Sequence, residues 1–192
     1  MTAKSKHMAP AIPRRISIRR AGAKDASVLS QMGKLTFTQS YASIIPAEEL
    51  ASYTSRAFSL EQIGAELGAA EITYLLALAG TGPCGYSKLA PSDAPPAIDG
   101  SNPVELARLY ILPEWTGKGI GTMLIEKSLA AVLERGCRSC WLRVWTGNER
   151  AIRFYHRWGF REVGSEPYNV GRCSEMVLLM VRDLSRNDLS GK

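Results

Sequence analysis

The sequence predicts an α/β (α+β) fold, a single domain in which a mixed, mostly antiparallel sheet is flanked by helices. Short strand-type runs are interspersed with longer helical runs along the chain, an order typical of one layered domain. Two strand-type runs, 72–79 and 85–89, are separated only by the turn 80–83, which indicates a hairpin. The 192 residues contain no internal repeat and no abrupt change in composition, so one domain is expected.

The first third of the chain is expected to form one strand followed by helices. Residues 15–19 alternate apolar and polar side chains, as a half-buried strand does. Asp25 is a plausible N-cap for a helix over residues 26–40. The segment 46–50 begins with proline and carries two acidic residues, a composition typical of a first helical turn. A further short helix is expected over residues 60–67.

The remaining elements follow the predicted hairpin. Residues 90–103 contain four prolines and a glycine, which predicts a loop. Gly136 indicates a helix end, and Asn148 can cap the next helix. The pattern from there predicts four strands and two helices: strands at 104–112, 141–145, 161–163 and 176–182, and helices at 122–135 and 148–158.

The net charge of +6 is concentrated at the start of the chain. Residues 1–20 carry six Lys and Arg side chains and no acid, so the remaining residues balance to zero. Residues 1–13 are polar and aperiodic and are expected to be a disordered basic arm, before a domain at 14–184 and a tail at 185–192. The body shows no basic patch with interleaved aromatics, so no nucleic-acid partner is expected. A nucleic-acid-associated protein that uses the basic arm stays the alternative.

The sequence also argues against membrane and metal chemistry. No apolar run approaches the ~20 residues of a membrane span, and no secretory signal follows the basic start, so a cytoplasmic location is expected. Cys137 and Cys140 form a lone Cys-x-x-Cys, and the only histidines are His7 and His156. Zinc needs further ligands at suitable spacing, so we expect buried free thiols and no metal.

The stretch between the strand at 104–112 and the helix after it carries the clearest functional signal. Gly117, Gly119 and Gly121 alternate where the strand passes into the helix. Glycines let a backbone approach a ligand closely, and a helix start offers unpaired N–H groups to an anion. The spacing differs from the dinucleotide fingerprint and from a Walker A loop. A phosphate-binding turn and a plain tight turn therefore both fit this pattern.

A second signal lies one strand–helix unit later, in Asn148-x-x-Ala151-x-x-Phe154-Tyr155-x-x-x-Gly159-Phe160. Ala151 and Tyr155 are one helical turn apart and so share a helix face. A tyrosine at such a place is usually a half-buried aromatic residue. The upstream glycine turn gives it a possible chemical role.

Together the two segments resemble the GNAT N-acetyltransferase superfamily, over about residues 15–182 and most specifically over 104–160. The resemblance implies acetyl-CoA as the cofactor and an acyltransferase as the enzyme class. It implies that the backbone of the strand before the turn, at Leu109, Tyr110 and Ile111, meets the pantetheine arm. It also implies that the turn binds the pyrophosphate through Thr116, Gly117, Lys118, Gly119, Ile120, Gly121 and Thr122. Thr116 departs from the family's usual Gln or Arg.

The resemblance assigns further roles to individual residues. Asn148 matches the residue that contacts the CoA arm, and Tyr155 matches the tyrosine that protonates the leaving thiolate. Arg157, like Lys118, is a cation that could meet CoA phosphates. We favour Glu105 as the general base, because it lies on the strand that meets the thioester. Weaker alternatives for the base are Glu48, Glu49 and Tyr41.

A finer resemblance concerns the bacterial spermine/spermidine N-acetyltransferase branch. It rests on residues 106–111 and 141–160, and it is poor over 25–70, where the acceptor site is shaped. It implies a small primary amine, such as a polyamine, as acceptor, with a protein N-terminus or lysine as the alternative. A homodimer is compatible with this reading. A non-catalytic CoA-binding module on the same fold is the remaining alternative. Acidic residues available to a polyamine are Glu48, Glu49, Glu61, Glu66 and Asp93.

Overall fold

A computed structural model describes residues 15–91, 93–98 and 102–185. The expected basic arm and nearly all of the expected tail lie outside these residues. The elements in chain order are β1 (Ile16–Arg20), η1 (Ala23–Asp25), α1 (Ala26–Tyr41), α2 (Ala47–Ala57), α3 (Leu60–Gly68), β2 (Thr73–Ala79), β3 (Gly82–Pro91), β4 (Val104–Ile111), η2 (Pro113–Trp115), α4 (Ile120–Glu134), β5 (Ser139–Trp145), α5 (Glu149–Arg157), β6 (Arg161–Val170) and β7 (Cys173–Asp183).

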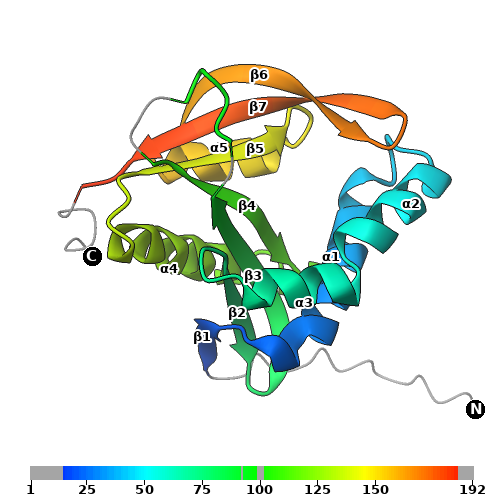
Figure 1. Ribbon diagram of the computed structural model, residues 1–192, viewed down its shortest axis with the longest axis horizontal. Coiled ribbons are helices and arrows are strands. Elements are labelled where there is room, and N and C mark those ends of the chain that lie inside the picture. Colours follow the sequence, from blue (N-terminus) through cyan, green and yellow to red (C-terminus); the bar gives the residue numbers. More distant parts are fainter. Residues whose placement is uncertain (1–14, 92, 99–101, 186–192) are drawn as a thin grey trace, which may run out of the picture.

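The strands form one seven-stranded sheet in the order β1-β2-β3-β4-β5-β7-β6. Every neighbouring pair is antiparallel except β4 and β5, which run parallel with α4 as the crossover between them. Helices α1–α3 lie on one side of β2–β4 and α4 lies on the other (Figure 1). The mixed, mostly antiparallel sheet flanked by helices confirms the predicted fold class.

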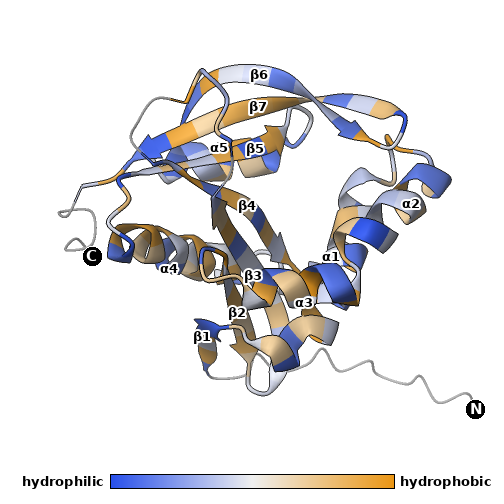
Figure 2. Ribbon diagram, in the orientation of Figure 1, coloured by the Kyte–Doolittle hydropathy of each residue, from blue (hydrophilic) through white to orange (hydrophobic). Residues whose placement is uncertain are grey.

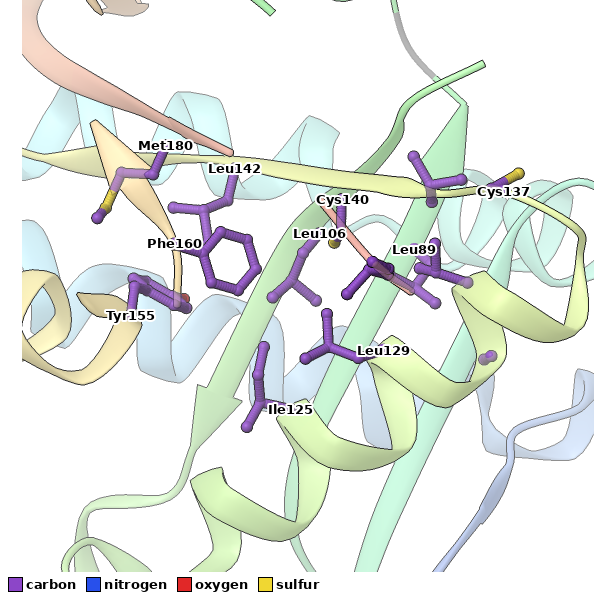
Figure 3. Packing of buried hydrophobic residues seen from close by; sticks show 14 of the residues in the cluster. Leu89, Leu106, Ile125, Leu129, Cys137, Cys140, Leu142, Tyr155, Phe160 and Met180 are labelled. Atoms are coloured by element: carbon purple, nitrogen blue, oxygen red, sulfur yellow. The ribbon is translucent and has the colours of Figure 1, made fainter. Parts of the chain in front are cut away.

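Two apolar cores hold the helices to the two faces of the sheet. On one face Leu29 of α1 and Ile63 of α3 pack with Leu76 and Tyr86 of the sheet. On the other face lies the core drawn in Figure 3, whose members come from β3–β5, α4, α5, β7 and the segments that follow α4, α5 and β7. Its labelled residues are Leu89, Leu106, Ile125, Leu129, Cys137, Cys140, Leu142, Tyr155, Phe160 and Met180. Burial of such side chains contributes roughly 1.5–3 kcal/mol each, which fixes both helix layers on the sheet.

The final hairpin is longer than the sequence pattern predicts. Strand β6 continues from Arg161 to Val170, although only residues 161–163 were expected, and β7 begins at Cys173 rather than at 176. Figure 2 shows why the signal is weak, because the edge strand β6 is far more hydrophilic than β7. β6 is mostly exposed and contains Pro167, a residue tolerated at a sheet edge. Pairing with β7, rather than local composition, makes it a strand.

Asp25 has a different role from the predicted side-chain cap. It occupies the N-cap position of α1, but its side chain forms no capping hydrogen bond. Its carboxylate instead accepts hydrogen bonds from Arg19 Nη1 and Nη2 at 2.8 and 2.7 Å, and from the Gly22 backbone N–H at 2.9 Å. The guanidinium of Arg19 holds the pKa of Asp25 well below its usual range, at about 2. Asp25 therefore ties β1 to the start of α1.

Candidate active site

The site is built where two parallel strands separate. β4 and β5 pair only at Val104–Cys140 and Glu105–Trp141, at the start of both strands. Beyond Glu105 the two strands no longer pair, and they separate. This opening exposes the end of β4 that leads into the glycine turn.

The backbone of the turn is held in conformations that favour glycine. Gly117 and Gly119 both have φ of +80°, and Gly119 is the N-cap of α4, which begins at Ile120 rather than at the predicted Thr122. A Cβ at either glycine would meet nothing within 4 Å, so the backbone there faces open space. Gly121 is crowded instead, because its Cβ would lie 3.1 Å from Ile111 Cδ1. The turn thus presents bare backbone beside the N-terminus of a 15-residue helix.

A groove of about 600 Å³ runs along this opening, a size typical of ligand sites. Twelve of the thirteen residues predicted to bind the cofactor line it: Leu109, Tyr110, Ile111, Thr116, Gly117, Gly119, Ile120, Gly121, Thr122, Asn148, Tyr155 and Arg157. Lys118 is the exception, and its ammonium lies 4.8 Å from the centroid of the Trp115 ring. The tertiary fold thus brings the strand end, the turn and α5 to one cavity.

Helix α5 and its capping residue contribute polar side chains to the groove. Asn148 caps this helix, as predicted, because its Oδ1 accepts a hydrogen bond from the Ala151 N–H at 3.1 Å. Tyr155 is one turn beyond Ala151 and is 8 % exposed, with its ring packed edge-on against Phe154 and Phe160. Burial raises the pKa of Tyr155 well above its ordinary value, so its hydroxyl stays protonated at neutral pH. The groove therefore contains a phenol able to donate a proton.

Glu105 lies outside the groove lining, on the opposite face of the sheet. Its neighbour Leu106 points into the core under α4, and alternation along the strand directs Glu105 the other way. The Arg143 guanidinium holds it there, with Nη1 2.7 Å from Glu105 Oε1. Nε of Arg143 is also 2.6 Å from Glu166 Oε1 on β6, so two carboxylates share one cation. Tyr155 and Glu105 thus occupy opposite sides of the sheet near the strand separation.

Of the weaker alternatives for the base, two have contacts that bear on that role. Burial raises the pKa of Tyr41 to about 12, so the Tyr41 hydroxyl is protonated near neutral pH and cannot accept a proton as a base would. Glu49 is ion-paired with Arg172, with Nε 2.7 Å from Oε1. Glu66, one of the acids available to a polyamine, is 2.7 Å from Lys88 Nζ in a buried cluster. Glu49 and Glu66 are therefore each paired with a cation, and neither lines the groove.

Some residues of the groove were missed by the sequence argument. Thr36, Gln39 and Ser40 of α1 form part of its wall, although they precede the glycine turn by about 80 residues. No local pattern marks them, since only the packing of α1 beside β4 brings them there. Arg150 and Phe154 of α5 could have been found, because they fall within the stretch that predicted Asn148 and Tyr155.

The rest of the described chain adds two negative findings. Within residues 15–91, 93–98 and 102–185, no helix combines the length and apolar character needed to cross a membrane. The same residues contain no group of three or more His, Cys, Asp or Glu side chains placed to hold a metal ion. The four cysteines are free, and Cys137 and Cys140 are buried, as predicted.

Comparison with known proteins places these features in context. The chain matches the acetyltransferase (GNAT) family over residues 38–160, more than half of its length. It is 30 % identical over 160 residues to an uncharacterized N-acetyltransferase of Mycobacterium tuberculosis, which covers 83 % of this chain and 98 % of the relative. It is 27 % identical over 150 residues to a spermidine N(1)-acetyltransferase of Thermoplasma acidophilum, covering 76 % of this chain and 88 % of that protein.

Solved structures share the same fold. The PaiA N-acetyltransferase of Thermoplasma acidophilum, solved in complex with coenzyme A, has a TM-score of 0.70 at 24 % identity, covering 88 % of this chain and 99 % of that one. YncA, a putative acetyltransferase of Salmonella typhimurium solved with acetyl-CoA, has a TM-score of 0.68 at 20 % identity, covering 90 % and 95 %.

Proposed function

This chain belongs to the acetyltransferase (GNAT) family and is an acetyl-CoA-dependent N-acetyltransferase, and we propose on that premise that it acetylates a small primary amine. We further propose Tyr155 as the general acid and Glu105 as the general base. The observation that carries the proposal is the single groove that joins the glycine turn, the end of β4 and Tyr155.

The residues of the groove fit a CoA thioester. The N-terminus of α4 and the open backbone at Gly117 and Gly119 suit a pyrophosphate, because unpaired N–H groups and the helix dipole favour an anion. We assign the pyrophosphate to residues 116–122 and the pantetheine arm to the backbone of 109–111. Arg157 lines the groove and Lys118 belongs to the same turn although it is outside the lining, and we propose that both add positive charge near the phosphates. Acetyl-CoA, when bound, supplies the acetyl group as a thioester, whose C–S bond is replaced by the new C–N bond while coenzyme A leaves as the free thiol.

Tyr155 supports the departure of the thiol. A free thiol has a pKa near 8.5, so a thiolate leaving group benefits from a nearby proton donor. Tyr155 lines the groove, and burial raises the pKa of its hydroxyl, which keeps it protonated at neutral pH. Asn148 begins the same helix and fixes its first turn through the Ala151 N–H. Tyr155 is therefore our candidate for the acid.

Glu105 supports the attack by the amine. An alkyl ammonium has a pKa near 10.4 and must lose a proton before it attacks a carbonyl. Glu105 is on the face opposite Tyr155, so the two groups can serve the amine and the thiol from different sides. Arg143 holds the Glu105 carboxylate in a defined orientation. Proton transfer through water is compatible with this placement.

A polyamine is the acceptor we favour. One support is the 27 % identity with a spermidine N(1)-acetyltransferase. The other is the pair of carboxylates Glu105 and Glu166, which bring two negative charges to the single positive charge of Arg143. A surplus of negative charge favours a polycation. A protein N-terminus or lysine is the second acceptor class. A cytoplasmic location, which free cysteines favour, and a homodimer belong to the same proposal.

Calorimetry and an acceptor screen test the function. Coenzyme A should bind the folded protein with measurable heat, and acetyl-CoA with spermidine or spermine should release free thiol. The screen includes a lysine peptide and a free peptide N-terminus, so a different acceptor class gives its own signal. Absence of CoA binding by folded protein would refute the cofactor assignment. Binding without thiol release on any amine would indicate a non-catalytic module.

A further inference from the structure

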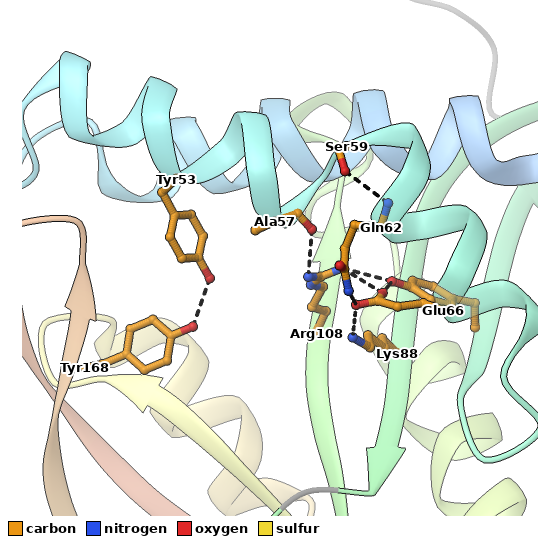
Figure 4. Close-up of polar contacts among 9 residues, drawn as sticks. Tyr53, Ala57, Ser59, Gln62, Glu66, Lys88, Arg108 and Tyr168 are labelled. Carbon is orange, nitrogen blue, oxygen red and sulfur yellow. Dashed lines mark hydrogen bonds and ion pairs between the residues drawn. The ribbon is translucent and has the colours of Figure 1, made fainter.

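A buried cluster of charged side chains lies beside strand β4, on the face that carries α2 and α3 (Figure 4). Arg108 of β4 donates hydrogen bonds to the Tyr74 hydroxyl at 2.9 Å and to the Ala57 carbonyl at 3.2 Å. Its Nη1 is also 3.6 Å from Glu66 Oε2, and the two side chains are only 12 % and 8 % exposed. One guanidinium therefore joins β4 to β2, to the end of α2 and to α3.

The carboxylate of Glu66 is shared within this cluster. Lys88 of β3 donates to it at 2.7 Å, Gln62 donates at 2.9 Å, and the Tyr74 hydroxyl donates as well. The cluster thus holds two buried cations and one carboxylate. Burying charges carries a desolvation cost that apolar residues of the same size would avoid. The desolvation cost of burying Arg108 therefore indicates that this side chain has a role beyond packing.

The position of Arg108 along β4 suggests its purpose. In the pairing with β3, Lys88 faces Arg108 and Leu89 faces Leu106, so Ala107 is left over as a β-bulge. A bulge interrupts the ladder, bends the strand and re-aims the residues beyond it. Those residues, Leu109 to Ile111, line the groove. Arg108 is the first residue after the bulge and the one held by α2 and α3.

We propose that Arg108 is a positioning residue for acetyl transfer, because it anchors the bulged β4 so that a backbone N–H within 109–111 faces the reacting carbonyl. This inference rests on the proposed function. A planar guanidinium offers five donors in a rigid fork, which lets one side chain bind three elements at once. Backbone donors stabilise charge on a carbonyl oxygen only when they are held at the right place, and misplacement by about 1 Å can cost roughly 10²-fold in rate.

The test compares Arg108→Gln with Lys88→Met in the full chain. Both variants remove a cation that contacts Glu66, but only the first releases β4 from α2 and from Tyr74. We expect Arg108→Gln to lower kcat by roughly tenfold or more, with the CoA dissociation constant and the KM for acetyl-CoA changed less than about threefold. Lys88→Met should change the melting temperature and leave kcat within about twofold.

If the Arg108→Gln variant does not fold, Arg108→Lys serves as the conservative variant. A lysine keeps the charge but cannot reach the Ala57 carbonyl and the Tyr74 hydroxyl together, so kcat should stay well below that of the unchanged protein. The inference is overturned if Arg108→Gln or Arg108→Lys has unchanged kcat, or if Lys88→Met loses kcat equally. An unchanged protein that binds CoA but transfers no acetyl group would instead refute the proposed function.

Discussion

Arg143 of β5 donates a 2.7 Å hydrogen bond to Glu105 of β4, the residue that forms with Trp141 the last pair joining the two parallel strands. The same guanidinium binds Glu166 of the edge strand β6 at 2.6 Å. Two carboxylates thus have the same partner but different positions relative to the strand opening. This pairing offers a matched comparison for the role of Glu105.

Glu105→Gln should lower kcat roughly 10²-fold, because an amide cannot accept the proton of the attacking amine. Glu166→Gln removes the other partner of Arg143 and should change kcat less than about threefold, since part-exposed ion pairs contribute little. The measurement is thiol release with both acetyl-CoA and the amine saturating, so that weaker amine binding in Glu166→Gln is not counted as a loss of kcat. Equal losses in the two variants would assign Glu105 to the ion pair and leave the base to another group.

Tyr155→Phe should also lower kcat roughly 10²-fold while the CoA dissociation constant changes less than about threefold. Tyr168→Phe is the control, because it deletes a hydroxyl that bonds Tyr53 at 2.9 Å outside the groove lining. Since burial raises the pKa of Tyr155, the acid stays protonated as pH rises, and its ionisation should not lower kcat between about pH 8 and 9.5. A kcat that is unchanged in Tyr155→Phe would exclude the acid role.

Gly119→Ala should weaken CoA binding by roughly tenfold, because a φ of +80° costs a residue with a Cβ roughly 1–2 kcal/mol and the turn is expected to shift. Gly64→Ala is the matched control within α3, where a Cβ would meet nothing within 4 Å. That variant should leave CoA binding unchanged and raise the free energy of unfolding by up to ~1 kcal/mol. Titration calorimetry and urea unfolding measure the two effects. Equal CoA affinity in both variants would contradict the pyrophosphate assignment.

The Arg19–Asp25 pair predicts a specific loss of stability in acid. The pKa of Asp25 is lowered from 3.8 to about 2, chiefly by the hydrogen bonds from Arg19. A depressed pKa contributes stability that is present above about pH 4 and is lost as the pH falls toward 2, by at most about 2 kcal/mol. Urea unfolding of Asp25→Asn should show a deficit at pH 6 that shrinks by pH 3. A deficit independent of pH would show that the ion pair is not its source.

The part of the groove formed by the glycine turn and α5 could be predicted from local sequence because its signals are short-range. Gly119 has a positive φ just before α4, and Asn148 caps its own helix, as expected. Both effects act over only a few residues. Contacts between segments that are distant in the chain could not be predicted in this way. Thr36 of α1 reaches the groove and Tyr53 of α2 bonds Tyr168 of β6 only through packing between distant segments.

By itself the sequence determined the order of helices and strands, the glycine turn and the placement of Tyr155, since periodicity and turn chemistry are properties of neighbouring residues. The tertiary structure alone decided that β6 extends to Val170, that Arg143 rather than solvent meets Glu105, and that Asp25 binds Arg19. Those outcomes depend on which strands lie side by side and on which charges are buried together. Neither is encoded in the periodicity of a single segment, because each contact joins two different elements: β6 with β7, β5 with β4, and β1 with the start of α1.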